Sequence, residues 1–278
     1  MERLAVVIVT YNSAREIRDC LGALPAAARS TPYEAVVVDN ASADGTAAIV
    51  RAEHPDVRVI DAGGNLGFAR ANNLGIGATG SDLVLLLNPD TVPEPDALDA
   101  LVAVFDAQPR VAVAGPRIVD RAGRAELSFG AMIDPFAELR QKFLSVGHDR
   151  GWPFVSAQVE RWARQPGFPD WVSGACLLIR RASLERAGLL DERYFLYTED
   201  VDLCAAVRAQ GGLIRFSPEA QVVHVRGASR ATAGSAADQA YRRSQLAFYR
   251  KHHPAWAPVL AAYLKVRGRL PDTSKQDR

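Results

Sequence analysis

Cysteine is scarce in this chain of 278 residues, and long apolar runs are absent. The three cysteines, Cys20, Cys176 and Cys204, show no C-x-x-C spacing and no matching histidine pair, so neither a disulfide framework nor a zinc site is indicated. No apolar run reaches the roughly 18 residues that a membrane span needs, and the run at residues 4–9 is too short for a signal peptide. We therefore expect a cytoplasmic protein in a reducing compartment that touches a membrane only peripherally, on its inner face.

Net charge is also small, because basic and acidic residues nearly cancel to give +1. No global field therefore favours nucleic acid as a partner. The charges are locally uneven, since no acidic residue lies between Asp238 and Asp272. The same stretch carries the basic residues Arg242, Arg243, Arg250, Lys251, Lys265, Arg267 and Arg269. The basic charge is thus a property of the C-terminal tail.

The strongest structural signal is the apolar run at residues 83–87, which is followed by Asn88, Pro89 and Asp90. Five apolar residues with this punctuation are typical of a strand buried on both faces, as in the middle of a parallel sheet. Pro89 cannot donate to a ladder and ends the strand, so Asp90 is expected just past its carboxyl end. Open α/β sheets bind ligands at that edge. Asp90 is therefore either a turn residue or a ligand for a divalent cation.

Strand and helix signals alternate through the first half of the chain. Strands are expected at residues 4–9, 35–38, 57–60, 83–87 and 111–114, and helices at about 13–24, 46–53, 67–78 and 97–105. Ser13 and Glu16 form a capping-box pattern at the start of the first helix. Four alternations of this kind predict a parallel sheet with right-handed crossovers.

The segment Gly75–Gly80 satisfies the pattern G-x-G-x-x-G. It ends a predicted helix and precedes a strand, whereas the dinucleotide fingerprint must follow a strand and open a helix. A Rossmann dehydrogenase is therefore rejected.

The second half of the chain is less regular. Residues 117–170 show one plausible helix, at 135–144, and form either a substrate lid or a misread pair of elements. Beyond them we expect strands at 171–179, 212–216 and 221–225, a short helix at 183–187, and two C-terminal helices at 238–253 and 258–270. Thr198 can cap a helix that runs to about residue 209 and holds Glu199, Asp200 and Asp202 in its first turn. Three acids there exceed what capping requires.

Six motifs together resemble the family 2 inverting glycosyltransferases with the GT-A fold, and among them most closely the bacterial rhamnosyltransferase-type members. The motifs are Val9-Thr-Tyr-Asn-Ser13, Val38-Asp-Asn-Ala-Ser42, Gly64-Asn-Leu-Gly-Phe-Ala-Arg-Ala-Asn72, Leu87-Asn-Pro-Asp90, Ser173-Gly-Ala175 and Phe195-Leu-Tyr-Thr-Glu-Asp-Val-Asp-Leu203. The resemblance implies an α/β GT-A domain over residues 1–227, with a mostly parallel central sheet flanked by helices. Within it we expect a nucleotide-binding half at 1–116, a variable acceptor-side region at 117–170 and a catalytic half at 171–227. A basic helical extension at 228–278 follows.

The resemblance also implies which residues bind the nucleotide-sugar donor. These are Thr10, Tyr11, Asn12, Asp39, Asn65, Arg70, Asn88 and Asp90. Asp39 would accept from the imide N–H of uracil or thymine, and a carboxylate, which only accepts, would repel the acceptor-rich edge of other bases. A dTDP-sugar or UDP-sugar donor is therefore expected. Asn65 and Arg70 would lie near the ribose and the diphosphate.

A divalent cation, Mg²⁺ or Mn²⁺, is the cofactor that the resemblance implies. Asn88 and Asp90 stand where the family has a D-x-D pattern, so only one carboxylate is kept. Asp90 and His224 are the expected metal ligands. Because a histidine is as often a satisfied core or surface residue, that role of His224 stays open here.

The same resemblance makes Asp200 the general base that deprotonates the acceptor hydroxyl, and Gly174, Glu199 and Asp202 acceptor-binding residues. A positioned base typically contributes about 10² to 10⁴ in rate. The expected reaction moves a sugar, with rhamnose from dTDP-rhamnose as the first expectation, onto a glycan or lipid-linked acceptor in cell-surface polysaccharide synthesis. The cation and Arg70 would stabilise the leaving diphosphate.

Two other functions are weighed against this one. A sugar nucleotidyltransferase needs a Gly-rich loop and basic residues after the first strand, but residues 10–13 contain neither, and the first lysine of the chain is Lys142. A catalytically silent nucleotide-sugar-binding subunit is disfavoured by the intact acidic segment. For the C-terminal helices two interpretations stay open, namely packing on the catalytic domain and docking on an anionic membrane surface, for which Trp256 and Tyr263 are suited.

Overall fold

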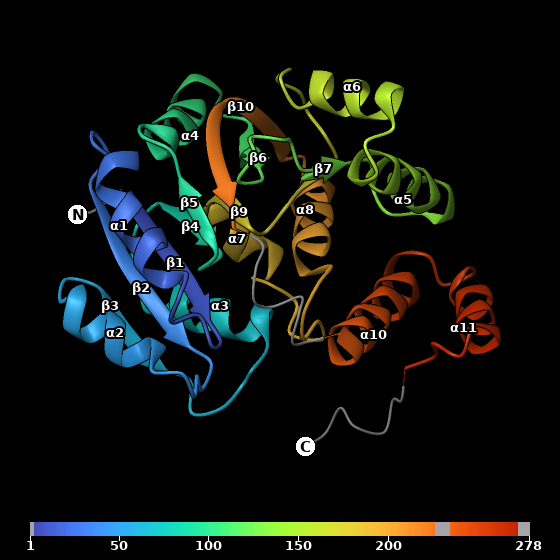
Figure 1. Cartoon of the computed structure of the whole chain (residues 1–278), viewed down its shortest axis with the longest axis horizontal. Helices are drawn as coiled ribbons and strands as arrows, with labels where there is room; N and C mark the ends of the chain where they lie inside the picture. The colour runs from blue at the N-terminus through green and yellow to red at the C-terminus, as the bar shows by residue number, and fades with distance from the viewer. Residues whose placement is uncertain (1–2, 226–233, 272–278) are drawn as a thin grey trace.

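The computed structural model describes residues 3–225 and 234–271, and it centres on a mixed sheet of eight strands (Figure 1). The strand order is β3-β2-β1-β4-β9-β6-β10-β5. The strands are β1 (Leu4–Thr10), β2 (Tyr33–Asp39), β3 (Arg58–Asp61), β4 (Leu83–Leu87), β5 (Thr91–Pro93), β6 (Val111–Val119), β9 (Cys176–Arg180) and β10 (Leu213–His224). The expected α/β architecture, with a central sheet flanked by helices, is confirmed.

Helices cover both faces of the sheet. They are α1 (Ile17–Ala27), α2 (Thr46–Glu53), α3 (Phe68–Gly77), α4 (Ala97–Ala107), α5 (Pro135–Asp149), α6 (Pro153–Trp162), α7 (Arg181–Ala187), α8 (Glu199–Ala209), α10 (Gly234–His252) and α11 (Ala257–Val266). A short ribbon of β7 (Phe129–Gly130) and β8 (Trp171–Val172) stands beside the sheet. No helix of the described ranges is both long enough and apolar enough to cross a membrane.

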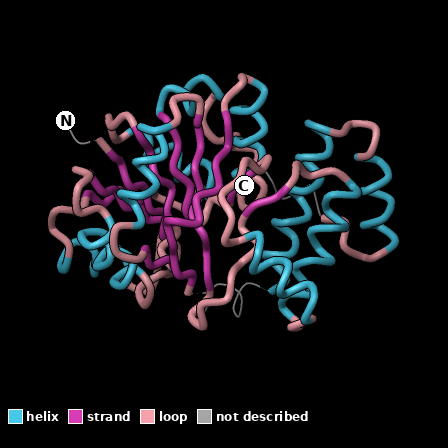
Figure 2. Tube along the Cα trace, turned by 90° about the horizontal axis from the view of Figure 1, so that it is seen from above, coloured by secondary structure: helices cyan, strands magenta, loops and turns pink. Residues whose placement is uncertain are grey.

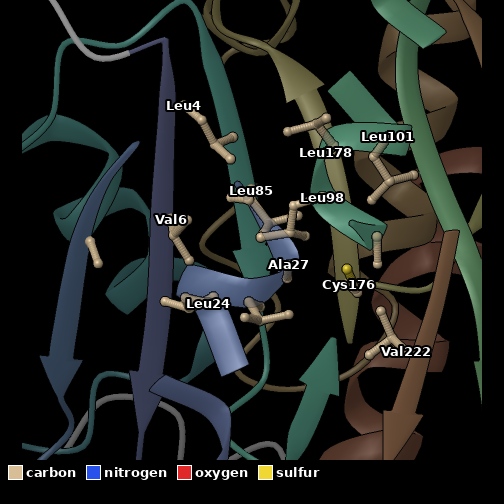
Figure 3. Packing of buried hydrophobic residues seen from close by; sticks show 14 of the residues in the cluster. Leu4, Val6, Leu24, Ala27, Leu85, Leu98, Leu101, Cys176, Leu178 and Val222 are labelled. Atoms are coloured by element: carbon tan, nitrogen blue, oxygen red, sulfur yellow. The ribbon is translucent and has the colours of Figure 1, made fainter. Parts of the chain in front are cut away.

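Alternate residues of the buried strands fill two cores on opposite faces of the sheet. Leu4 and Val6 of β1 face one side, where they pack with Leu24 of α1 and Leu98 of α4 (Figure 3). Val7 faces the other side, in a cluster built mainly by α3, α7 and α8. Burial on both faces explains why β1 and β4 are apolar without interruption.

The direction of some strands differs from the prediction of a parallel sheet. β1, β2, β3 and β4 pair in parallel, as do β6 and β10, but β9 runs antiparallel to β4 and β6, and β5 runs antiparallel to β10. The strand expected at residues 171–179 is split into β8 and β9 by the loop Ser173–Ala175. The two strands expected at 212–216 and 221–225 are one strand, β10, with a register shift between Ser217 and Gln221.

Residues 117–170 were a misread pair of elements rather than a structureless lid. β6 extends to Val119, α5 runs five residues further than expected, and a second helix, α6, packs against it. Two capping predictions were also wrong, because neither Ser13 nor Thr198 makes a side-chain cap to its helix. The hydroxyl group of Thr198 instead donates to the backbone carbonyl of Tyr197.

The helices α5, α6, α10 and α11 lie together at the end of the molecule opposite β3 and α2 (Figure 1). Seen from above, the strands occupy one side and a group of helices the other (Figure 2). A side chain of α10 bonds to the rest of the domain, since the hydroxyl of Ser244 donates to the backbone carbonyl of Leu196 at 2.7 Å. The expected boundary at residues 227/228 lies outside the described residues.

Candidate active site

The carboxyl ends of β1, β2 and β4 meet at one edge of the sheet, because these strands are parallel and paired in register. Thr10 is the register partner of Asp39, and Asn88 follows the last residue of β4. Parallel strands that end together expose their loops at a common crevice, the usual ligand site of an open α/β sheet. The expectation that Thr10, Asp39 and Asn88 share one edge is confirmed by this pairing.

Asp39 is buried and held by a fixed set of donors. The hydroxyl of Thr10 donates to its Oδ1 at 2.9 Å, the hydroxyl of Ser42 donates to the same oxygen at 2.6 Å, and the backbone N–H of Ser42 donates to Oδ2 at 3.0 Å. These bonds fix the orientation of the carboxylate. The motif pattern did not reveal that Ser42 holds Asp39 in place.

Tyr11 and Asn12 form the loop that follows β1. Asn12 has a φ of 54°, a left-handed conformation that asparagine tolerates better than most residues, and its Oδ1 accepts from the N–H of Ala43 at 2.8 Å. Its backbone N–H donates to the hydroxyl of Ser42. The ring of Tyr11 is about half exposed, with 53% of its surface accessible, and is available to stack on a planar group.

Asn40 is a second residue that the sequence reasoning missed. Its amide nitrogen donates to the carbonyl of Gly67 at 3.1 Å, and its Oδ1 accepts from the N–H of Leu66 at 3.2 Å. Asn65 turns back on the same loop, because its Oδ1 accepts from the N–H of Gly67. The loop that opens α3 is thus clamped to the end of β2. The signal for Asn40 was its position directly after Asp39.

Arg70 lies in the first turn of α3, and its side chain is 62% exposed. Its guanidinium group pairs with Glu192 at 3.9 Å. At this exposure such a pair is weak, so the guanidinium can exchange Glu192 for a more highly charged anion. No hydrogen bond or ion pair links Arg70 to Asp90 within residues 3–225 and 234–271.

Asp90 and His224 lie side by side, as expected. The antiparallel pairing of β5 with β10 sets Thr91 opposite His224, and the Nε2 of His224 lies 3.3 Å from the Oδ1 of Asp90. On the other side of the ring, Nδ1 lies 3.1 Å from Glu126 Oε2. Glu126 was missed, because it falls in the irregular region that gave no pattern.

The carboxylates of Asp90 and Glu126 favour the protonated form of His224, which must lose its proton before the imidazole can bind a cation. Burial lowers the pKa of His224, but the hydrogen bonds and charges of Asp90 and Glu126 outweigh it and raise that pKa to about 9. A carboxylate on the far nitrogen of a histidine is the usual way in which a metal ligand is oriented. In the part of the chain that the structure describes, no three His, Cys, Asp or Glu side chains converge on one point. Asp90 and His224 can therefore supply two ligands, which fits Mg²⁺ or Mn²⁺ completed by phosphate and water.

The loop Ser173–Ala175 connects the segment that bears Asp90 to the acidic start of α8. The N–H of Asn88 donates to the carbonyl of Ala175 at 2.9 Å, and the N–H of Gly174 donates to Asp200 Oδ2 at 2.8 Å. A Cβ at position 174 would lie 3.2 Å from the Cβ of Asp200, so only glycine allows this approach without displacement. Gly174 therefore positions Asp200.

Asp200 and Glu199 start α8, and the pKa of each is raised above its usual range. Burial raises the pKa of Asp200, although the N–H groups of Gly174 and Val201 lower it in part. Burial and the neighbouring charge of Asp200 raise the pKa of Glu199 well above its usual range, and its Oε2 is buried without a hydrogen-bond partner. The pKa of Glu199 is therefore moved further from its usual range than the pKa of Asp200. Such a split is a typical arrangement for acid and base roles.

Asp202, the third acid of the segment, points into the protein. Its Oδ1 accepts from the hydroxyl of Tyr194 at 3.1 Å and contacts the Nε2 of His252 at 2.6 Å, while its Oδ2 lies 2.7 Å from the Nζ of Lys251. The side chain of Asp202 is 3% exposed. These contacts join α8 to α10, and the acceptor-binding role expected for Asp202 stays a prediction.

The family model described as "Glycosyl transferase family 2" matches residues 5–186. The chain belongs to this family. A relative in Mycobacterium tuberculosis, named N-acetylglucosaminyl-diphospho-decaprenol L-rhamnosyltransferase, is 31% identical over 96% of this chain and 94% of its own. A hexosyltransferase of low-salt glycan biosynthesis from Haloferax volcanii is 27% identical over 76% of this chain and 63% of its own.

Solved structures of other glycosyltransferases share the fold of this family 2 enzyme. A mannosyltransferase of Pyrobaculum calidifontis, in complex with GDP-Man and Mn²⁺, has a TM-score of 0.62 at 21% identity, covering 94% of this chain and 69% of its own. S. aureus TarS 1–349, in complex with UDP-GlcNAc, has a TM-score of 0.58 at 16% identity, covering 98% and 74%. The protein is a family 2 glycosyltransferase with the GT-A fold, and both predictions are confirmed.

Proposed function

We propose that this glycosyltransferase moves rhamnose from dTDP-rhamnose to a hydroxyl group of a lipid-linked glycan acceptor, with inversion at the anomeric carbon, in the synthesis of a cell-surface polysaccharide. The name of the mycobacterial relative supports the donor sugar and the acceptor class. The observation that carries the proposal is the chain of contacts from Asn88 through Ala175 and Gly174 to Asp200. These contacts hold the carboxylate of Asp200 next to the loop that bears Asp90.

Donor recognition is assigned to the loops after β1 and β2. Asp39 has one oxygen occupied by two hydroxyl groups and the other by one N–H, so Oδ2 retains lone-pair capacity for the imide N–H of thymine or uracil. Tyr11 supplies an exposed ring on which the base can stack. Asn12 keeps the two loops at a fixed separation.

The leaving diphosphate is assigned to Asp90, His224 and Arg70. A divalent cation bound there would act as a Lewis acid toward the diphosphate oxygens. Asp90 and His224 would hold the cation, and Glu126 would keep the imidazole turned toward it. Arg70 leaves its weak pair with Glu192 to meet the negative charge that develops on the diphosphate.

Asp200 is the group that accepts the proton of the acceptor hydroxyl. The N–H groups of Gly174 and Val201 aim its two oxygens before substrate binds, so little reorganisation is needed. Glu199, kept neutral by burial, can donate a hydrogen bond to the acceptor. The hydroxyl oxygen then attacks the anomeric carbon from the face opposite the diphosphate, which inverts the configuration.

Peripheral contact of the C-terminal helices with a membrane belongs to the same proposal. Val259, Tyr263 and Val266 are exposed at helical spacing on α11, and Lys265, Arg267 and Arg269 lie close by. Apolar and basic side chains in such a pattern are typical of helices that lie on anionic lipid.

The donor assignment is tested by thermal shift with dTDP-rhamnose, UDP-GlcNAc and GDP-mannose, followed by a transfer assay with a lipid-linked N-acetylglucosamine diphosphate. We expect dTDP-rhamnose to raise the melting temperature most, since a ligand at 100 times its Kd stabilises by about 2.7 kcal/mol. GDP-mannose is expected to have little effect. An equal response to GDP-mannose would overturn the pyrimidine assignment. Formation of a nucleotide sugar from dTTP and a sugar phosphate would support the nucleotidyltransferase instead.

A further inference from the structure

The α5–α6 hairpin turns large apolar side chains outward. Phe136, Leu139 and Phe143 follow one another at i, i+3 and i+7 on α5 and are 76%, 68% and 55% exposed. Phe154, at the start of α6, is 92% exposed. The ring of Phe143 meets Trp152 edge-on at 5.6 Å, which continues the surface from one helix to the next. A contiguous exposed apolar surface of this kind marks an interaction site.

The exposed charges of the same hairpin are mostly positive. Its exposed basic residues are Arg140, Lys142, Arg150 and Arg161, against the single exposed acid Asp149. The other two acids of the hairpin are drawn inward. Glu138 accepts from the hydroxyl of Tyr249 at 2.9 Å, and Glu160 accepts from the N–H of Ala125 at 2.7 Å. The surface is therefore both apolar and basic.

We propose that the α5–α6 hairpin docks on an anionic lipid bilayer, with Phe136, Leu139, Phe143 and Phe154 inserted at the interface and the basic side chains against lipid headgroups. Apolar insertion combined with headgroup charge is the chemistry of interfacial membrane binding. The purpose of this contact rests on the proposed function, because a lipid-linked acceptor presents its reactive hydroxyl near the bilayer surface.

The position of the hairpin suits this use. It is inserted between Ser128 and Ser173, whose backbones are joined by a hydrogen bond of 2.8 Å. The loop Ser173–Ala175 begins there and holds Asp200 through Gly174. Docking through the hairpin would therefore keep the acceptor side of the active site close to the membrane.

A second copy of the chain fits this surface less well. Most dimers are symmetric, so the same patch would meet itself. The four exposed cations of one hairpin would then face the same four cations of the other, with one exposed acid on each side to offset them, and like charges brought together across an interface oppose association. An anionic bilayer removes that conflict.

The test is sedimentation of the full chain with vesicles of phosphatidylglycerol and phosphatidylcholine in equal amounts, at low salt. We expect the unmodified chain to bind, and the triple variant Phe136→Ser, Leu139→Ser, Phe143→Ser to bind more than about tenfold more weakly, since each buried apolar side chain adds to the partition. The double variant Lys142→Glu, Arg150→Glu should lose more than about tenfold as well. Leu74→Ser, which removes an exposed apolar residue of α3, should bind as the unmodified chain does.

The proposal is overturned if the unmodified chain fails to bind these vesicles, or if both hairpin variants bind as well as it does while the C-terminal helices are intact. A concentration-dependent dimer that the triple variant abolishes would assign the surface to a second copy and also overturn it. Release of dTDP from dTDP-rhamnose in the absence of vesicles is measured in parallel. If the unmodified chain releases no dTDP, the proposed function is contradicted. The vesicle measurement still decides whether the hairpin binds lipid.

Discussion

Gly174 and Asp200 are the two residues whose contact defines the proposed catalytic half of the site. The N–H of Gly174 meets the carboxylate of Asp200 at 2.8 Å, and the next residue, Ala175, accepts from Asn88. A side chain at position 174 would have to displace Asp200, the loop or both. The geometry of the proposed base therefore depends on the absence of a Cβ in the loop before β9, the strand that pairs with β4.

Gly174→Ala should lower kcat by about threefold or more, because the added Cβ, 3.2 Å from the Cβ of Asp200, must displace that residue by a few tenths of an ångström and reacting groups have to be held within about 0.5 Å. The affinity for the donor should change little, since Asp39 and Thr10 are untouched. Steady-state kinetics and calorimetry with dTDP measure the two effects. Gly22→Ala, on an open face of α1 where a Cβ meets nothing within 4 Å, is the matched control and should keep full activity. Unchanged kcat in Gly174→Ala would remove this positioning role.

The pH profile of transfer should show an acid limb above the ordinary aspartate value of about 3.9. Burial raises the pKa of Asp200, and only its deprotonated form accepts a proton, so activity is lost as the pH falls through that raised pKa. Glu199→Gln, which mimics the neutral acid, should leave the limb in place. A flat profile down to pH 4 in a protein that stays folded would speak against Asp200 as base.

At the scale of elements, the first half of the fold was predictable because its strands are buried on both faces and its turns carry proline, glycine and asparagine. β4 was placed at its observed bounds, Leu83–Leu87. The antiparallel direction of β9 was not predictable, since a fully apolar strand has the same pattern in either direction. The prediction divided β10 into two strands because Pro218 and Glu219 resemble a turn. In the structure the strand continues past them with a shift of register between Ser217 and Gln221.

The same reasoning explains what was missed in the site. α6 gave no helical pattern because residues such as Phe154 are apolar and exposed, which removes the usual contrast between faces. Glu126 and Asn40 act through contacts with His224 and with Gly67 that are distant in sequence. The motifs identified candidate residues, but tertiary contacts decide which of them point inward, as Asp202 does.

Asp202→Ala should lower the free energy of unfolding by about 3 kcal/mol, because it leaves Lys251 and His252 without their shared buried partner. The change belongs to the element scale, since these contacts fasten α10 to α8. Denaturant unfolding measures it. Asp238→Ala, which removes longer and more exposed pairs with Arg242 and Arg269 at 3.6 and 3.9 Å, should cost less than about 1 kcal/mol. Equal losses in the two variants would contradict the anchoring role.

For the whole molecule, the nucleotide half expected on β1 to β4 and the catalytic half expected on β9 and α8 stay predictions. The divisions at 1–116, 117–170 and 171–227 remain predictions. Both halves would contribute to the proposed cation site, because Asp90 follows β4 and His224 ends β10. Binding of the cation and of the donor should therefore depend on both halves of the sheet being folded together.

Transfer should require Mg²⁺ or Mn²⁺, and Asp90→Ala should weaken binding of dTDP more than binding of thymidine, because only the diphosphate contacts the cation. Calorimetry with the two ligands, with and without the cation, measures the difference. Asp96, which is exposed at the start of α4 and pairs with Arg29 at 3.5 Å, gives the control Asp96→Ala. Full activity in excess chelator would rule out the dependence.

Asp200→Asn tests the central claim most directly, because it replaces the base by an amide of the same shape. The measurement is transfer of rhamnose from dTDP-rhamnose to the lipid-linked acceptor, with dTDP affinity determined on the same preparation. We expect transfer to fall by about 10² to 10⁴, the usual contribution of a general base, while dTDP affinity stays within about twofold. Retention of most of the transfer activity in Asp200→Asn would contradict the account.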